Sequence, residues 1–416
     1  MKIISADRLR FLVSRLRDRL WLKPLVVCIL SIAGAFIAKL ADRSDLGAFV
    51  PSISIDSVET ALSIMAASML VIATFSVSSM VSAYASASST ATPRSFSLVV
   101  ADDASQNALS TFVGAFIYSI VALTAVKNDY YETAGIFLLF VLTGVVFAIV
   151  IFTFVRWVDR IARLGRLGST IEKVEQATED AIRRRRLLPY LGGAELLTTP
   201  SGRAIYAAGV GYVQHIDMAA LQQWAEDAQA NIQVVALPGT LAAPGRPLAY
   251  VSTQSDAKLE TLSKAFQIGS TRLFDDDPRF GLVVLSEIAS RALSEAINDP
   301  GTAIGIVSTL TRLFTQWCDP LAEEQVPTMK YERVEVPSLS INDMFDDAFT
   351  AIARDGAGTV EVAVRLQKAL AALGSLNNAD VQAAAAYHSQ LALKRARIAM
   401  DIDEDFQAMQ SAATQS

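Results

Sequence analysis

The sequence contains only two cysteines and two histidines, and only 19% of its 416 residues are charged. Cys28 and Cys318 stand far apart, so they form neither a CxxC redox pair nor a disulfide framework. His215 and His388 leave little for a histidine-based metal site, and we expect no metal and no cofactor. The phosphate-binding patterns GxxxxGKS/T and GxGxxG and the hydrolase patterns HExxH and GxSxG are missing. These absences argue against an enzyme, and we expect no catalytic residue.

Apolar residues are abundant instead: they make up 52% of the chain, whose mean hydropathy is +0.36. Soluble domains have about 45–50% apolar and about 25% charged residues, so part of this chain is expected to lie in a membrane. A helix that crosses the hydrocarbon core needs roughly 20 apolar residues. Four uncharged runs meet or approach this length, and the second, residues 60–93, is too long for one crossing. We predict transmembrane helices at about 21–40, 60–84, 104–126 and 133–155.

Charge is divided unevenly along the chain. Residues 1–186 contain 20 Lys and Arg against 15 Asp and Glu, whereas residues 187–416 contain 16 against 27. Twelve basic residues flank the four runs on one side, and three flank them on the other: Lys39, Arg43 and Lys127. The positive-inside rule therefore predicts that both termini lie in the cytoplasm.

Two basic segments border the predicted transmembrane domain. Residues 1–20 have the pattern of an amphipathic helix, and residues 156–186 that of a connecting helix that ends in four arginines. We interpret both as neighbours of anionic lipid headgroups, although residues 1–20 could instead pack on the protein's own soluble domain. Nucleic acid is not expected, because no aromatic residues are interleaved. The headgroup candidates are Arg15, Arg17, Arg19, Arg183, Arg184, Arg185 and Arg186.

The second crossing carries a stripe of small and hydroxyl side chains at spacings of three and four. The stripe either packs helices together or lines a water-filled path in an assembly of several copies. No crossing has a central charged residue, which argues against an ion-coupled transporter but allows a passive channel. Pro93 should end this helix. Pro93 and Arg94 are the candidates for the inner mouth of the pore; the alternative is that they only cap the helix and that Arg94 snorkels to the lipid surface. The pore-lining candidates are Ser63, Thr74, Ser78, Ser82 and Ser86.

The rear half predicts a soluble domain in two parts. Residues 187–254 read as short strands with glycine and proline turns, typical of a small barrel-like subdomain, and residues 255–416 as mainly helical. We expect a helix at 256–267 and a lone strand at 331–336. His215 is interpreted as a half-buried polar residue and Asp275–Asp277 as a solvated turn, which is favoured over a cation site.

A turn at residues 297–303 combines an Asp cap with proline at the first helical position. Its candidate residues are Asn298, Asp299, Pro300 and Thr302. The predicted fold class is thus an α-helical membrane protein: four transmembrane helices followed by a cytoplasmic α+β domain.

Several motifs resemble an uncharacterised bacterial family of predicted membrane proteins, domain of unknown function 2254. They are Pro93-Arg94, Phe112 with Tyr118, Gly211-Tyr212-Val213-Gln214, Asp277-Pro278 and the string from Arg291 to Ala303. The resemblance covers about residues 10–320 and leaves out the acidic helical tail. Thr92 and Glu295 depart from the serine and proline expected there. The resemblance implies a bacterial inner-membrane protein with four crossings and supplies no activity.

Two functions follow as hypotheses. The first is a homo-oligomeric passive ion pore lined by the second crossing, with a cytoplasmic domain that assembles and gates it. The second is a membrane-anchored sensor or scaffold, in which the stripe only packs helices and the soluble domain binds a ligand or partner. An enzyme that acts on lipid through Asp299 is a third, less favoured hypothesis.

Overall fold

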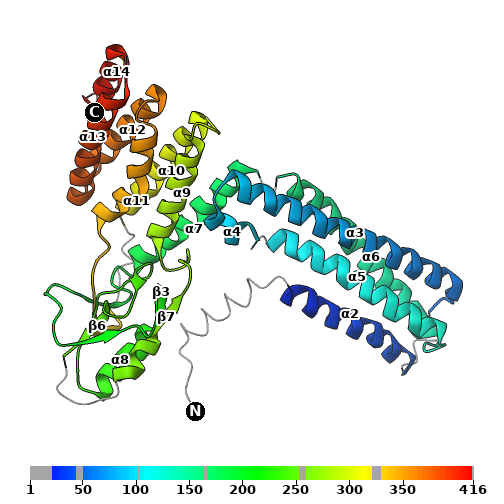
Figure 1. Ribbon diagram of the computed structural model, residues 1–416. Helices are drawn as coiled ribbons and strands as arrows, with labels where there is room; N and C mark the ends of the chain where they lie inside the picture. The colour runs from blue at the N-terminus through cyan, green and yellow to red at the C-terminus, as the bar shows by residue number, and fades with distance from the viewer. Residues whose placement is uncertain are drawn as a thin grey trace. The chain divides into compact units, whose positions relative to one another are not determined.

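Four long helices account for most of the N-terminal part of the chain (Figure 1). The computed structural model describes residues 21–43, 50–100, 103–163, 166–252, 259–320 and 329–414, so the predicted helix at 1–20 lies outside the described residues. Each of the four helices is long and apolar enough to cross a membrane, which confirms the predicted candidate crossings. They are α2, Leu22–Leu40, continued by η1, Ala41–Arg43; α3, Ile55–Thr90; α5, Asp103–Lys127; and α6, Thr133–Ile161.

The second of these helices, α3, is longer than a bilayer crossing requires. Its 36 residues span about 54 Å at about 1.5 Å per residue, whereas the hydrocarbon core is about 30 Å thick. The helix ends at Thr90, before Pro93 as predicted, and is followed by η3, Pro93–Ser95, and α4, Phe96–Val100. One end of α3 therefore extends beyond the hydrocarbon.

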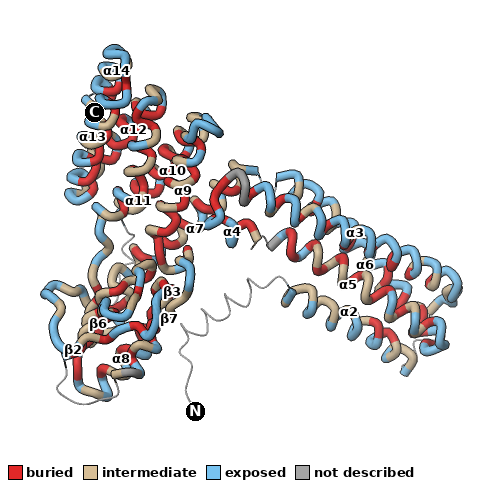
Figure 2. The backbone as a smooth tube through the Cα atoms, viewed as in Figure 1, coloured by how far each residue is buried: buried red, intermediate tan, exposed pale blue. Residues whose placement is uncertain are grey.

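Helix α5 lies at the centre of the bundle, because it contacts α2, α3 and α6. Its buried Phe112 packs edge-to-face against Trp157 of α6, with ring centroids 6.1 Å apart. The hydroxyl of Tyr118 lies 3.1 Å from that of Thr143 on α6. The outward faces of α3 and α6 are exposed along most of their length (Figure 2). These exposed faces carry many large apolar side chains, as expected of a surface in contact with lipid.

One carboxylate fastens α2 to α6 at the end of the bundle. The side chain of Asp42, in η1, is only 2% exposed and forms a salt bridge of 3.1 Å with Lys39. Its two oxygens accept hydrogen bonds from the backbone N–H groups of Glu132, at 2.9 Å, and Gly135, at 2.6 Å. A Cβ atom at Gly135 would lie 2.6 Å from the carboxylate, so only glycine allows this approach. Asp42 thus caps the N-terminus of a helix 90 residues further along the chain.

The chain divides into two compact units at residues 170 and 171, within the first turn of α7, Leu167–Leu187. The described residues up to 170 form the membrane unit, and the described residues from 171 on belong to what we call the C-terminal unit. The predicted basic helix 156–186 is in fact two elements, since α6 continues to Ile161 and α7 begins at Leu167.

Two sheets and helix α8, Met218–Asp227, form the first part of the C-terminal unit. They share one core, which includes Val213, Leu221, Leu248 and Val334. In the five-stranded sheet, of order β1-β8-β4-β6-β2, β8 runs parallel to both neighbours; the three-stranded sheet, of order β5-β3-β7, is antiparallel. The strands are β1, Gly193–Glu195; β2, Arg203–Tyr206; β3, Gly211–Ile216; β4, Ile232–Val234; β5, Leu241–Ala242; β6, Pro247–Val251; β7, Phe266–Gly269; and β8, Tyr331–Val336.

Three sequence predictions differ from this arrangement. The described strands form two separate sheets and not one closed barrel. The strand at 331–336 is not alone, because β8 pairs with β1 and β4, so the boundary predicted at residue 254 cuts through the sheet region. The segment predicted as a helix at 256–267 is described from residue 259 on, as η4, Leu259–Ala265, followed by β7.

Six helices complete the described part of the C-terminal unit, in agreement with the mainly helical pattern predicted for residues 255–416. Their core contains an aromatic cluster in which Phe314 of α10 lies 4.4 Å from Phe345 and 5.6 Å from Phe349 of α11, between ring centroids. The six are α9, Pro278–Ala292; α10, Pro300–Cys318; α11, Ile341–Asp355; α12, Val360–Gly374; α13, Ala379–Ala399; and α14, Asp403–Thr414.

Candidate functional site

The hydroxyl stripe of α3 faces away from the chain's own bundle. All five candidate side chains, Ser63, Thr74, Ser78, Ser82 and Ser86, are exposed. The opposite face of α3 supplies the buried residues, among them Leu62, Met65, Met69, Ala73 and Met80. The five candidate side chains are therefore not buried against helices of the same chain. Packing between copies and the lining of a water path stay open.

Four serines of α3 lie together in a shallow groove. A cavity of about 440 Å³ is lined by Ser78, Ser79, Ser82 and Ser86, together with Ala83 and, from α6, Ile161. Ser79 was missed by the sequence analysis, because it lies one residue off the spacing of the stripe. Further along the stripe, the Thr74 hydroxyl donates to the carbonyl of Val71 at 2.9 Å, as hydroxyls in apolar surroundings commonly do. Among the cavities described, this groove is the one that several hydroxyls of the stripe line together.

The two inner-mouth candidates form a tight turn directly after α3. Thr92 has extended backbone, and its hydroxyl accepts a hydrogen bond from the N–H of Arg94 at 3.0 Å. Pro93 occupies the first position of η3, and the buried Ser95 donates to the carbonyl of Thr92 at 2.8 Å. The side chain of Arg94 is exposed. This turn fixes where the chain leaves α3.

The arginine run at the end of α7 is directed at the C-terminal unit itself. Arg184 donates through Nε to the carbonyl of Asp275 at 3.0 Å, Arg185 to that of Asp276 at 3.3 Å, and Arg186 to that of Asp319. Arg183 pairs with Asp180 on its own helix at 2.6 Å. Arg185 is only 3% exposed, and burial lowers its pKa to about 10. The prediction that Arg185 contacts lipid headgroups is wrong, because its side chain is buried.

The N-terminal arginines Arg15, Arg17 and Arg19 lie outside the described residues. Arg183 and Arg184 are exposed, and Arg186 is half-buried. Of the seven headgroup candidates, the structure thus describes four, and three of these are hydrogen-bonded to carbonyls of the C-terminal unit.

The turn at Asp275–Asp277 is anchored and not merely solvated. Asp277 is 3% exposed, accepts two hydrogen bonds from Arg272 at 2.7 and 3.0 Å, and caps α9 through the N–H of Phe280. Burial raises the pKa of its carboxyl, and Arg272 opposes this. A carboxylate oxygen of Asp276 lies 2.7 Å from Nδ1 of His215, a pairing that the sequence could not indicate. No group of three possible metal ligands occurs among the described residues.

The candidates of the 297–303 motif form an exposed turn that caps α10. Asn298 is exposed and has a φ of +49°, in the left-handed region that Asn tolerates better than most residues. Asp299 accepts hydrogen bonds from the N–H of Thr302 at 3.0 Å and from its hydroxyl at 2.5 Å, and Pro300 follows at the first helical position. These bonds lower the pKa of Asp299. The capping role predicted for Asp299 is confirmed.

The comparisons with known proteins bear on the whole chain. No curated protein and no solved structure matches it. A family described as predicted membrane protein, DUF2254, matches residues 17–372. The resemblance drawn from the motifs is confirmed, but the match extends beyond residue 320, through α11 and most of α12, and leaves out only α13 and α14 of the acidic tail. The chain therefore belongs to the DUF2254 family of predicted membrane proteins, a family of unknown function.

Proposed function

We propose that several copies of the chain assemble around an axis and form a passive ion-conducting pore, lined by the hydroxyl stripe of α3. The observation that carries this proposal is the orientation of the stripe: its hydroxyls are exposed on the outside of the single chain. In lipid, a row of exposed hydroxyls is poorly placed, whereas at an axis between copies it faces either water or a partner helix.

The residues around the stripe support conduction without coupling. No Asp, Glu, Lys, Arg or His occurs in the sequence between Glu59 and Arg94, so α3 offers an ion no fixed charge beyond Glu59. Hydroxyl oxygens can replace part of the hydration shell of an ion, as the carbonyl oxygens of selectivity filters do. Proton-coupled transport generally requires an ionisable group within the membrane, which the stripe does not supply.

The spacing of the stripe sets the expected geometry of the assembly. From Thr74 to Ser86 the hydroxyls follow an i, i+4 row. Such a row is inclined by about 26° to the helix axis. For the row to line a common axis, the α3 copies must be tilted by about this angle in the ring.

The proposal places the chain in the bacterial inner membrane with both termini in the cytoplasm, beside anionic lipids, on the basis of the loop charges. The C-terminal unit would then assemble beneath the pore and gate it, without an enzymatic activity. Its connection to the membrane unit supports a mechanical role, since α7 is fastened to α10 by Glu175, which pairs with Arg312 at 2.6 Å.

Ion flux through proteoliposomes tests the proposal. The purified full chain should release an ion gradient, and Ser78→Leu with Ser82→Leu should abolish the flux because the added apolar volume excludes water. Val77→Leu with Val81→Leu, on another exposed face of the same helix, is the matched control and should retain it. Absence of flux from the unmodified chain, or equal flux from both double variants, contradicts the proposal.

The second candidate function is a membrane-anchored sensor or scaffold. The observation that favours it is the exposed turn before α10, where residues 294–298 are all exposed and the apolar Ile297 is 51% exposed. Under this alternative, liposomes that contain the protein pass no ions. A ligand or partner raises the melting temperature of the full chain, and it does not raise the melting temperature of the Ile297→Ser variant.

A further inference from the structure

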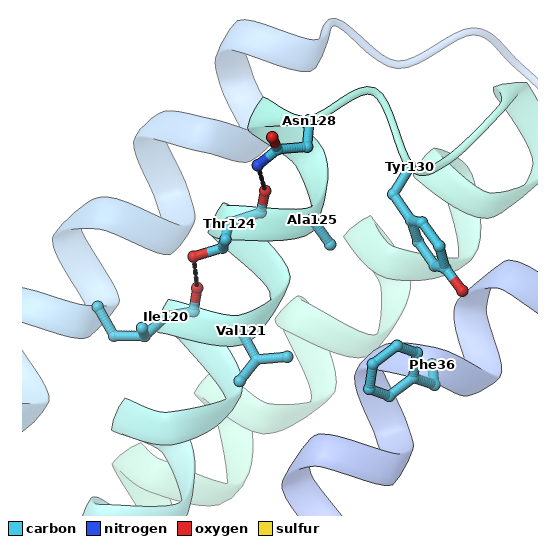
Figure 3. Close-up of a pocket in the computed structure, with 7 residues that line it drawn as sticks. All are labelled: Phe36, Ile120, Val121, Thr124, Ala125, Asn128 and Tyr130. Carbon is cyan, nitrogen blue, oxygen red and sulfur yellow. Dashed lines mark hydrogen bonds between the residues drawn. The ribbon is translucent and has the colours of Figure 1, made fainter.

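A groove between α2 and α5 lies at the end of the bundle that carries Asp42. It has a volume of about 360 Å³ and is lined by one residue of α2, four of α5 and two of the following loop. Figure 3 shows how their side chains surround it: Phe36, Ile120, Val121, Thr124, Ala125, Asn128 and Tyr130. The stretch of α5 from Ile120 to its end at Lys127 covers about 10 Å along the helix, at about 1.5 Å per residue.

The side chains that line the groove are mostly apolar. Phe36, Ile120, Val121 and Ala125 are apolar, and the hydroxyl of Thr124 donates to the carbonyl of Ile120 at 2.8 Å. The amide nitrogen of Asn128 donates in turn to the carbonyl of Thr124 at 2.7 Å (Figure 3). Because both donors are bonded to backbone carbonyls of α5, the groove suits an apolar occupant.

One wall is held in place by contacts outside the groove. The rings of Phe36 and Tyr130 meet edge-to-face with centroids 6.1 Å apart, and the ammonium group of Lys39 lies 5.6 Å from the centre of the Tyr130 ring. Lys39 is paired with Asp42, which caps α6. The distance between the two walls is therefore set by α2, α5 and α6 together, and the groove exists before any ligand binds.

The position of the groove identifies its surroundings. It occupies the last two turns of α5, a helix long and apolar enough to span the membrane, and Tyr130 lies three residues after the end of that helix. Tyrosines are enriched where hydrocarbon meets headgroups, and Asn128, Tyr130 and Lys39 supply polar groups at this end. Inward from them, the lining is apolar and the neighbouring solvent is lipid hydrocarbon.

We propose that this groove binds one acyl chain of a bilayer phospholipid, whose headgroup lies at Asn128 and Tyr130. The proposal is independent of conduction through the α3 stripe, because the groove is formed by α2 and α5. The bound chain contacts Phe36 and Tyr130 on one side and Ile120, Val121 and Ala125 on the other.

Photo-crosslinking of the full chain tests this site. The protein is reconstituted with phosphatidylcholine that carries a diazirine in the upper part of one acyl chain, illuminated and digested. At one fixed mole fraction of labelled lipid, label should concentrate about tenfold more on the peptide with residues 120–130 than on the exposed face of α6, because a groove that encloses the chain keeps the diazirine at the protein longer than an open surface does.

Filling the groove provides the structural arm of the experiment. Ala125→Trp, and separately the smaller change Val121→Phe, should lower labelling of residues 120–130 about tenfold, because the added ring takes the place of the chain's methylene groups. Val145→Trp, on the exposed face of α6, is the matched control and should leave that labelling unchanged. A melting curve in detergent confirms that each variant is folded.

Three results would overturn the proposal. The first is equal labelling of residues 120–130 and of the exposed face of α6. The second is unchanged labelling in a folded Ala125→Trp or Val121→Phe variant. The third is recovery of the groove peptide cross-linked to a second copy of the chain, which would make a protein the occupant.

Discussion

At the scale of single residues, polar groups in the membrane unit act mainly by fixing helices to one another. Asp42 is the clearest case, since its buried carboxylate caps α6 from the end of α2 and is paired with Lys39. A carboxylate at a helix N-terminus is stabilised both by the N–H groups and by the helix dipole. This contact was not predictable, because nothing in the sequence indicates that residues 42 and 135 meet.

Replacement of Asp42 by asparagine should therefore destabilise the protein by about 1 kcal/mol, within the usual range for a helix cap. The amide keeps the size of the side chain but directs a donor at the N–H groups of α6. Thermal unfolding of the full chain in detergent measures the loss, and Glu59→Gln serves as the control because its contact with Lys127 is long, at 3.9 Å. Equal melting temperatures for the two variants would mean that the cap does not fasten the helices.

His388 makes the stability of the C-terminal unit depend on pH. Its side chain is 3% exposed beside Phe345, and burial lowers its pKa below the ordinary value, while Asp346 partly opposes this. In the unfolded chain the imidazole takes up a proton near pH 6.5. Below that pH, and down to the lower pKa of the folded state, the unfolded chain binds more protons, so stability falls as pH falls.

We expect the urea midpoint of the full chain in detergent to decrease between pH 7.5 and pH 5.5. One proton contributes at most about 1.4 kcal/mol per pH unit. His388→Phe should flatten this part of the pH profile, and Arg395→Gln should not, although Arg395 also faces the imidazole. A slope that stays the same in His388→Phe would assign the pH dependence to other groups.

At the scale of elements, α7 connects the two units and is held in the C-terminal unit over most of its length. Thr178 meets Gly281 of α9, where a Cβ atom would overlap the Thr178 side chain, and Glu175 pairs with Arg312 of α10. The arginines at its end bind the turn that caps α9. A displacement of α7 therefore has to move α9 and α10 with it.

Replacing two nearby arginines of α7 one at a time compares the stability that a buried, anchoring arginine supplies with the stability that an exposed one supplies. Arg185→Ala should destabilise the C-terminal unit by about 1.5–3 kcal/mol, because it removes a buried charged donor from the Asp276 carbonyl. Arg183→Ala should cost less than about 1 kcal/mol, because its pair with Asp180 is exposed. Urea unfolding of the full chain in detergent distinguishes them, and a larger loss in Arg183→Ala would show that α7 is not anchored in this way.

The elements that the sequence predicted well are those with local signals. Asp299-Pro300 combines a cap with proline at the first helical position, and α10 begins at that proline. The partners of β8 were not predictable, because β1 and β4 lie about 100 or more residues away in the sequence. The arginine run was misread at Arg185, since a run of like charges does not indicate which member is buried.

At the scale of the whole molecule, the spacing of hydroxyls on α3 was visible in the sequence, but its orientation was not. A stripe of serine and alanine is equally compatible with packing inside a bundle and with an outer surface. The structure places it outside, opposite the buried methionines of α3. For the proposed pore, this exposed face becomes the wall of a water-filled path when copies assemble.

Reactivity of single cysteines along α3 tests that central claim most directly. The background is the full chain with Cys28→Ala and Cys318→Ala, reconstituted in liposomes and treated with a charged, water-soluble thiol reagent. Cysteine is introduced at Thr74, Ser78 or Ser82 on the stripe and, as matched controls, at Val77 or Val81, which are also exposed in the single chain.

If the stripe lines an aqueous path, cysteines at residues 74, 78 and 82 react quickly, whereas those at 77 and 81, which face lipid or a neighbouring helix, are protected. Equal protection at all five positions, or faster reaction at 77 and 81 than on the stripe, would contradict the account.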